Sequence, residues 1–197
     1  VVESLADISA DEWDACANPG GPVPYQPFLR HAFLAALETS GSATTDTGWQ
    51  PAHLVLGGAT PDAPVRGVVP MYLKSHSQGE YVFDHAWADA WRRAGGRYYP
   101  KLQICVPFTP APGRRFLARD NDDATRLALA NAAIGVARDN GVATVHATFV
   151  SEQEWNLLPQ AGYLQRMDQQ FHWHNPGYRH FDDFLADLAS KKRKNLK

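Results

Sequence analysis

Ionisable side chains gather in the segment KSHSQGEYVFDH, residues 74–85. They are Lys74, His76, Glu80, Asp84 and His85. Lys74, His76 and Glu80 are separated by even numbers of residues, so on a strand hairpin their side chains would share one face. His76 or Glu80 could act as a general base, because histidine titrates near neutral pH and burial raises the pKa of a glutamate. The alternative is a solvent-exposed turn, with Asp84 serving only as a helix N-cap.

A second group of polar residues follows in YYPKLQICV, residues 98–106. Tyr98 or Tyr99 could protonate a leaving group, although a tyrosine pair before a proline also suits core packing. Lys101 opens an expected strand, and sheet proteins commonly bind ligands at strand ends. We therefore predict the catalytic candidates His76, Glu80 and Tyr99, and the substrate-binding candidates Lys74, Asp84, His85 and Lys101.

The segment PAPGRR, residues 110–115, is a rigid cationic loop between an expected strand and an expected helix. Gly113 permits close approach of the backbone, and Arg114 and Arg115 could clamp an anion, so these three are the cofactor-binding candidates. The N-terminus of the helix would add a partial positive charge. The aspartates of the intervening RDNDD would repel an anion, however, and they also suit a role as helix caps.

Metal and thiol chemistry find little support. His172 and His174 would share one face of an expected strand, QQFHWHN, with Phe171 and Trp173 facing the core. No third ligand has the needed spacing, so we predict no metal. The two cysteines lie far apart without a CxxC spacing and are expected to be reduced.

Alternating helices and strands must position these residues. The expected helices are SADEWDACA with a Ser9–Glu12 capping box, FLRHAFLAALETSG, HAWADAWRRAGG, DDATRLALANAAIGVARDNG, EQEWNLLPQAG and the C-terminal FDDFLADLASKKRKNLK. The expected strands are PAHLVLGG and VRGVVPMYLKSHS, which have hairpin spacing around the turn ATPDAP, then EYVF, KLQICV, VATVHATFV and QQFHWHN. This order predicts an α/β (α+β) fold with helices on a mixed sheet.

Composition places the chain among ordinary globular domains. It has 197 residues, of which 44% are hydrophobic and 20% charged, and no apolar run could span a membrane. The start, VVESLADIS, does not resemble a signal peptide, so we expect a cytoplasmic protein. The net charge is -2, yet basic residues concentrate in the final KKRKNLK. That tail could bind nucleic acid, or it could be a solvated helix face.

Three longer strings resemble a known family. VPMYLKSHSQGEYVFDHAWADAW, YYPKLQICVPFTPAPGRR and FHWHNPGYRHFDDFLADLASKKRK are similar to the Fem-like (FemAB-like) peptidoglycan biosynthesis or recognition proteins, which have tandem GNAT-type acyltransferase domains. The resemblance implies a GNAT-like mixed, mostly antiparallel sheet flanked by helices over residues 1–177. Residues 178–197 would then begin a helix that leads into a second GNAT-like half. The chain departs from the pattern by ending there and by lacking a QxxGxG loop.

The resemblance also implies a reaction. Related enzymes transfer an acyl or aminoacyl group to an amine of a peptidoglycan precursor, from acyl-CoA or aminoacyl-tRNA, without a metal, a covalent intermediate or a tightly bound cofactor. Two alternatives stay open: a non-catalytic recognition half of a tandem protein, and a CoA-dependent N-acetyltransferase. A surface that docks the second half could also let the chain associate with itself.

Overall fold

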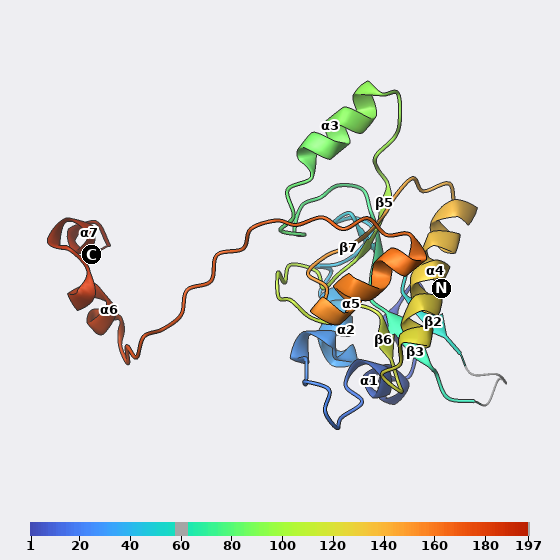
Figure 1. Ribbon diagram of the computed structural model, residues 1–197, viewed down its shortest axis with the longest axis horizontal. Coiled ribbons are helices and arrows are strands. Elements are labelled where there is room, and N and C mark those ends of the chain that lie inside the picture. Colours follow the sequence, from blue (N-terminus) through green and yellow to red (C-terminus); the bar gives the residue numbers. More distant parts are fainter. Residues whose placement is uncertain (58–62, 197) are drawn as a thin grey trace. The chain divides into compact units, whose positions relative to one another are not determined.

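The computed structural model describes residues 1–57 and 63–196 (Figure 1). It divides into two compact units, Val1–Gln165 and Arg166–Lys197. The turn predicted at residues 59–64 lies for the most part outside the described residues. Among the described residues, no helix combines the length and the apolar character needed to cross a membrane.

The first unit alternates helices and strands. Its helices are α1 (Ala10–Ala17), α2 (His31–Thr39), α3 (His85–Arg93), α4 (Asp123–Asp139) and α5 (Glu152–Leu157), with 3-10 turns η1 (Leu5–Asp7), η2 (Pro27–Leu29) and η3 (Leu158–Ala161). Its strands are β1 (Trp49–Pro51), β2 (Leu54–Leu56), β3 (Gly67–Val69), β4 (Met71–Lys74), β5 (Lys101–Ile104), β6 (Leu117–Ala118) and β7 (Val145–Ala147). The predicted α/β (α+β) class, with mostly antiparallel strands flanked by helices, is confirmed.

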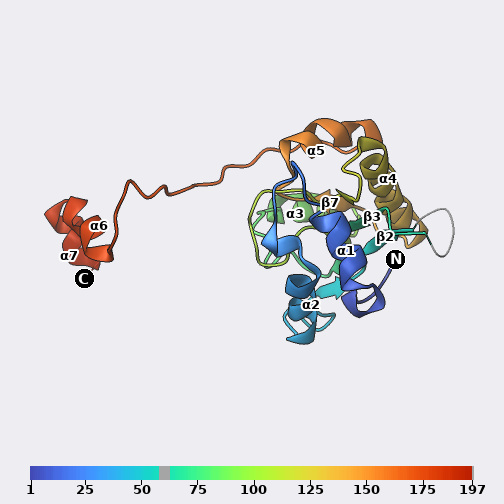
Figure 2. The same ribbon diagram turned by 90° about the horizontal axis from the view of Figure 1, so that it is seen from below.

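The strands form two sheets, in the orders β1-β4-β5-β7 and β2-β3-β6. Only the β5–β7 pair is parallel among the pairs described. The hairpin predicted around the turn ATPDAP exists, but each of its arms forms two strands, one in each sheet. In the second arm, Pro70 separates β3 from β4. A proline has no N–H to continue a strand ladder, so the chain changes sheet there. Figure 2 shows β2 and β3 between α1 on one side and α4 on the other.

The four-stranded sheet has two unlike faces, and this difference positions the site. On one face Met71, Leu102 and Ile104 pack against α4 in the main hydrophobic cluster. On the other face the register places Tyr72 opposite Gln103, and Lys74 opposite Lys101. Because side chains alternate along a strand, an apolar face under a helix necessarily leaves these polar side chains together on the opposite face.

Helix starts follow local hydrogen bonding. Asp122 caps α4 by accepting the N–H of Thr125 at 2.7 Å, and Ser151 with Glu154 forms a capping box on α5. The capping box predicted on α1 is wrong, because Ser9 makes no side-chain cap bond. The carboxylate of Glu12 instead accepts the backbone N–H of Val65 and a bond from Arg119.

Two predicted strands are wrong. Residues 81–84 are irregular, with Tyr81 at a positive φ of 57°. QQFHWHN is also not a strand, and Phe171 and Trp173 are exposed instead of facing a core. Alternation of apolar and polar residues makes a strand only where a neighbouring strand supplies hydrogen bonds, and residues 166–196 contain no strand.

The second unit holds two short helices, α6 (Phe181–Asp187) and α7 (Ser190–Leu196), in place of the single helix predicted. The helix breaks at Leu188, whose backbone is extended. Aromatic contacts organise the unit, since Phe184 meets Trp173, Tyr178 and Phe181 at ring-centroid distances of 5.7–6.2 Å. The assignment of residues 178–197 to the start of a second GNAT-like half stays a prediction.

Candidate functional site

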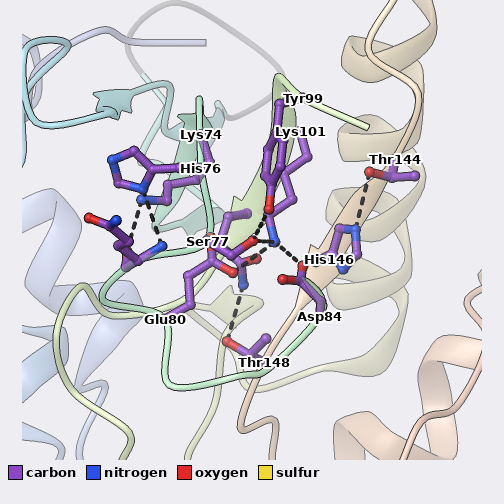
Figure 3. Close-up of polar contacts among 12 residues, drawn as sticks. Lys74, His76, Ser77, Glu80, Asp84, Tyr99, Lys101, Thr144, His146 and Thr148 are labelled. Carbon is purple, nitrogen blue, oxygen red and sulfur yellow. Dashed lines mark hydrogen bonds and ion pairs between the residues drawn. The ribbon is translucent and has the colours of Figure 1, made fainter. Parts of the chain in front are cut away.

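The centre of the candidate site is the ammonium group of Lys101, which is completely buried. Its Nζ donates to Ser77 Oγ at 2.9 Å, Glu80 Oε2 at 2.7 Å and Asp84 Oδ2 at 2.5 Å (Figure 3). An ammonium has three N–H donors, so Lys101 is saturated. Two buried carboxylates therefore share one buried cation.

The loop of residues 75–84 brings the carboxylates over the polar face of the sheet. It leaves β4 after Lys74, turns at Gly79 and ends where α3 begins. Gly79 has a φ of +78°, and a Cβ at this position would lie 2.6 Å from the ring of Phe108. Glycine is needed there for both reasons, and it turns the chain so that Glu80 points inward.

Two tyrosines and a histidine surround the cluster. The Tyr98 hydroxyl donates to Asp84 Oδ2 at 2.7 Å and lies 3.5 Å from His146 Nε2. The hydroxyls of Tyr99 and Ser77 are 2.7 Å apart. Tyr99 and His146 are half-buried, so they form the border between the buried cluster and solvent (Figure 3).

Four buried oxygen atoms on this face have no hydrogen-bond partner among the described residues: Tyr72 Oη, Glu80 Oε1, Asp84 Oδ1 and Gln103 Oε1, of which the last three are carboxylate or amide acceptors. The Gln103 amide nitrogen is occupied, since it donates to Thr148 Oγ1 at 3.1 Å. Leaving a buried acceptor unpaired costs roughly 1–3 kcal/mol, and native structures keep few such atoms. Three of them around one cluster suit a ligand that donates several N–H bonds.

The surroundings move the pKa values of the two carboxylates in opposite directions. Burial raises the pKa of Glu80 more than the nearby Lys101 ammonium lowers it. Burial would also raise the pKa of Asp84, but the hydrogen bonds from Lys101 and Tyr98 outweigh it and hold this pKa at about 2. Asp84 is therefore a permanent anion, whereas Glu80 is a stronger base than an ordinary glutamate.

Lys74 lies beside the cluster on the same face. Its Nζ stands 3.4 Å from the centroid of the Trp49 ring and donates to the Gln78 carbonyl at 3.2 Å. Burial lowers the pKa of Lys74 to about 8, against the opposing attraction of Glu80. A cation in this position loses its proton more readily than an ordinary lysine.

The two histidines predicted for the site lie apart from Lys101. His76 Nε2 contacts the Thr47 carbonyl at 3.1 Å, and its Nδ1 accepts the N–H of Gln78 at 3.1 Å, so both ring nitrogens are occupied. His85 is exposed at the start of α3. Asp84 stands at the N-cap position of α3, as one interpretation predicts, but its side chain makes no cap bond there and binds Lys101 instead.

The PAPGRR loop is held by its own arginines. Arg115 donates to the carbonyls of Thr148, Arg114 and Ala111, and it is almost fully buried. Arg114 Nη2 donates to the carbonyls of Ala17 and Pro24, while its buried Nη1 has no partner among the described residues. Gly113 and Arg114 line a cavity of about 370 Å³. Between these two arginines, Arg114 is the one that keeps a whole nitrogen, Nη1, without a partner among the described residues.

Other reactive residue types are placed less favourably. Cys16 and Cys105 are free and buried, and burial raises their pKa values to about 11 and about 12, so both remain thiols. His172 and His174 stack at 6.4 Å in the second unit. Within residues 1–57 and 63–196, no group of three His, Cys, Asp or Glu side chains is arranged to hold a metal.

Three residues of the site are not predicted from the sequence: Ser77, Gln103 and His146. Gln103, however, follows Lys101 by two positions in a strand with buried neighbours. Residues two positions apart in a strand face the same side, so a polar residue two positions after Lys101 in a buried strand is the signal that could have identified Gln103. His146 lies beside Gln103 on the parallel neighbour β7, which only the strand pairing reveals.

Fold and site together define a mixed α/β domain that keeps a cluster of ionisable groups buried on the polar face of its sheet. The model of the FemAB-like family, described as peptidoglycan biosynthesis/recognition, matches residues 4–197. The chain belongs to this family, and its role therefore lies in peptidoglycan biosynthesis or recognition. Neither the curated proteins nor the solved structures gave a match.

Proposed function

We propose that this chain binds the acceptor amine in an acyl- or aminoacyltransferase that acts on a peptidoglycan precursor. The observation that carries the proposal is the set of unpaired buried acceptors, Glu80 Oε1, Asp84 Oδ1 and Gln103 Oε1, beside a lysine that is already saturated. A primary ammonium group supplies three N–H donors, one for each of these carboxylate and amide oxygens, while the unpaired Tyr72 hydroxyl on the same face can donate as well as accept. The family's role in peptidoglycan chemistry supports an amine of a cell-wall peptide as this group.

The proposed reaction needs the ammonium to lose a proton before it attacks. Glu80, with its raised pKa, takes that proton, while the anionic Asp84 keeps the substrate nitrogen and Lys101 in place. The amine nitrogen then forms a bond to the carbonyl carbon of the donor. As the tetrahedral intermediate collapses, the bond from the carbonyl carbon to the sulfur of the thiol or the oxygen of the ribose breaks, and the half-buried Tyr99 hydroxyl, which contacts Ser77, gives a proton to that leaving atom.

The test is a calorimetric titration of this chain with a cell-wall peptide that carries one free side-chain amine, and with the same peptide N-acetylated. We expect binding only of the free amine, because acetylation removes its charge and two of its donors. Glu80→Gln should weaken this binding at least tenfold, a free-energy loss of about 1.4 kcal/mol. Glu152→Gln, which removes an exposed carboxylate from α5, is the matched control.

Equal binding of both peptides, or an undiminished affinity in Glu80→Gln, would contradict the proposal. Binding without any transfer, when a donor is added to a protein that includes the second half, would support the non-catalytic recognition alternative. The same peptides thus separate a transferase from a non-catalytic binding protein.

A second candidate, the CoA-dependent N-acetyltransferase, is favoured by one observation. Arg114 lines the cavity beside Gly113, and its buried Nη1, which has no partner among the described residues, is of a type that suits a phosphate oxygen. Titration with coenzyme A and acetyl-CoA tests this candidate, with Arg114→Gln compared against the exposed Arg138→Gln. Loss of binding only in Arg114→Gln would support a CoA donor. No binding by the unmodified chain would leave aminoacyl-tRNA, or a donor site outside this chain.

A further inference from the structure

Helix α3 (His85–Arg93) contributes no buried residue, whereas α1, α2, α4 and α5 of the same unit all do. The chain enters α3 directly after Asp84 and returns to the sheet at Tyr98. Figure 1 shows the helix projecting from the rest of the first unit. The two ends of this projection are joined by the hydrogen bond from the Tyr98 hydroxyl to Asp84. A short helix in this position must be maintained for something other than core packing.

The helix is strongly amphipathic, with its apolar face in solvent. Trp87, Ala90, Trp91 and Ala94 follow the spacing i, i+3, i+4, i+7 and so form one stripe. Trp87 is 59% exposed and Trp91 is 42% exposed, and the preceding Phe83 and Tyr81 are exposed as well. An apolar stripe on a surface helix ordinarily faces the core, so its exposure marks a surface that another phase or molecule covers.

The Trp91 ring is held in place by the glycines that end the helix. Gly95 adopts a φ of +83°, which turns the chain back. A Cβ on Gly96 would lie 2.3 Å from Trp91 Nε1, so the ring lies directly on the Gly96 backbone. An ordered ring loses little conformational entropy on docking, which favours binding through this face.

Positive charge accompanies the aromatic stripe. Arg92, Arg93 and Arg97 lie at the end of the helix and just after it, whereas residues 81–97 hold two acidic residues, Asp89 and the buried Asp84 that pairs with Lys101. Arg92 pairs with Asp89 at 2.6 Å, and both side chains are at least half exposed. This segment is thus locally cationic in a chain whose net charge is -2.

We propose that the α3 segment, residues 81–97, docks on an anionic phospholipid surface. Tryptophan and tyrosine rings favour the boundary between lipid headgroups and acyl chains, and arginines favour lipid phosphates. A short amphipathic helix with both features lies in the plane of the interface instead of spanning the membrane. The charge of the segment selects anionic lipid as the occupant, and the proposal does not depend on the amine site.

The experiment is co-sedimentation of the full chain with vesicles of equal parts phosphatidylglycerol and phosphatidylcholine, and with vesicles of phosphatidylcholine alone. We expect binding to the mixed vesicles that weakens as salt is added, and little binding to the neutral ones. Trp87→Ser/Trp91→Ser should lower the affinity for mixed vesicles about tenfold or more, and Arg92→Gln/Arg93→Gln should lower it by a similar factor. Tryptophan fluorescence should shift to the blue on binding and lose this shift in the double serine variant.

The basic tail provides the matched control, since it could also attract an anionic surface. Lys191→Gln/Lys192→Gln removes the same two charges as the arginine variant, and Trp173→Ser removes an exposed ring from the second unit. Both control variants should bind mixed vesicles as the unmodified chain does. The proposal is overturned if the lysine variant loses binding and the arginine variant keeps it. It is also overturned if the double serine variant binds undiminished, or if the unmodified chain ignores the mixed vesicles or binds neutral vesicles as tightly.

Discussion

Glu80 and Asp84 share the ammonium group of Lys101, but their environments give them different chemical roles. Asp84 accepts from both Lys101 and Tyr98, and its pKa is held at about 2 despite burial. Glu80 has one oxygen on Lys101 and one unpaired, and burial raises its pKa. Carboxylates whose pKa values are moved apart in this way typically divide the roles of fixed anion and proton acceptor.

Lys101 should be essential for stability because it balances both buried carboxylates. Lys101→Met leaves these charges unpaired and should destabilise the fold by about 3–5 kcal/mol. Adding Glu80→Gln and Asp84→Asn to that variant removes the unpaired charges and should recover much of the lost stability. Urea unfolding of the single and triple variants measures both effects. A single variant that loses less than about 1 kcal/mol would mean that the carboxylates are solvated and not buried as a pair.

Lys74 should make stability depend on alkaline pH. Its folded-state pKa of about 8 lies below the ordinary lysine value of about 10.4, so between these values the unfolded chain binds more protons. The cost of burying the charge is therefore fully present below about pH 8 and is relieved as pH rises through this window. Lys74→Met should stabilise the chain by about 2 kcal/mol at about pH 7. Urea unfolding of the two proteins from about pH 7 to about pH 10 should show this difference shrinking, and a constant difference would contradict it.

At the scale of elements, α5 holds the loop that precedes β6. Glu154 Oε1 accepts the backbone N–H groups of both Arg115 and Phe116 at 2.7 Å, while the same residue completes the capping box with Ser151. The helix thereby anchors the PAPGRR loop, and its own first turn depends on the same carboxylate.

Glu154→Ala should therefore cost more than an ordinary capping residue. It leaves two buried N–H groups unpaired and removes the cap, for an expected loss of about 3 kcal/mol. Glu152→Ala removes a neighbouring exposed carboxylate and should cost only a few tenths of a kcal/mol. Thermal unfolding of both variants compares them directly, and equal losses would show that the buried contacts of Glu154 contribute nothing beyond helix charge.

Elements with strong local patterns were predictable, and contacts between distant residues were not. KLQICV and the long helix of α4 carry clear strand and helix patterns and were predicted near their observed bounds. Glu80 and Asp84 are predicted as candidates because of their residue types, but the strand EYVF that was to align Glu80 with Lys74 and His76 does not form. Their meeting at Lys101 depends on the backbone turn at Gly79, which no periodicity encodes.

For the whole molecule, the hydrophobic clusters of the first unit are built from residues up to Tyr163. A chain that ends at Gln165 should therefore unfold in one cooperative transition, with a urea midpoint close to that of the full chain. Circular dichroism during urea unfolding measures this. Loss of the transition in the shorter chain would show that residues 166–197 complete the core.

Carboxyl-carbon NMR tests most directly whether an amine contacts the buried carboxylates. The Glu80 signal, assigned by its absence in Glu80→Gln, should titrate above the ordinary glutamate pKa of about 4.3 in the free chain. Saturation with the free-amine peptide should lower that pKa, because the bound ammonium stabilises the carboxylate, and the acetylated peptide should leave it unchanged. A Glu80 carboxyl that titrates at the ordinary value, or that responds equally to both peptides, would contradict the proposed amine site.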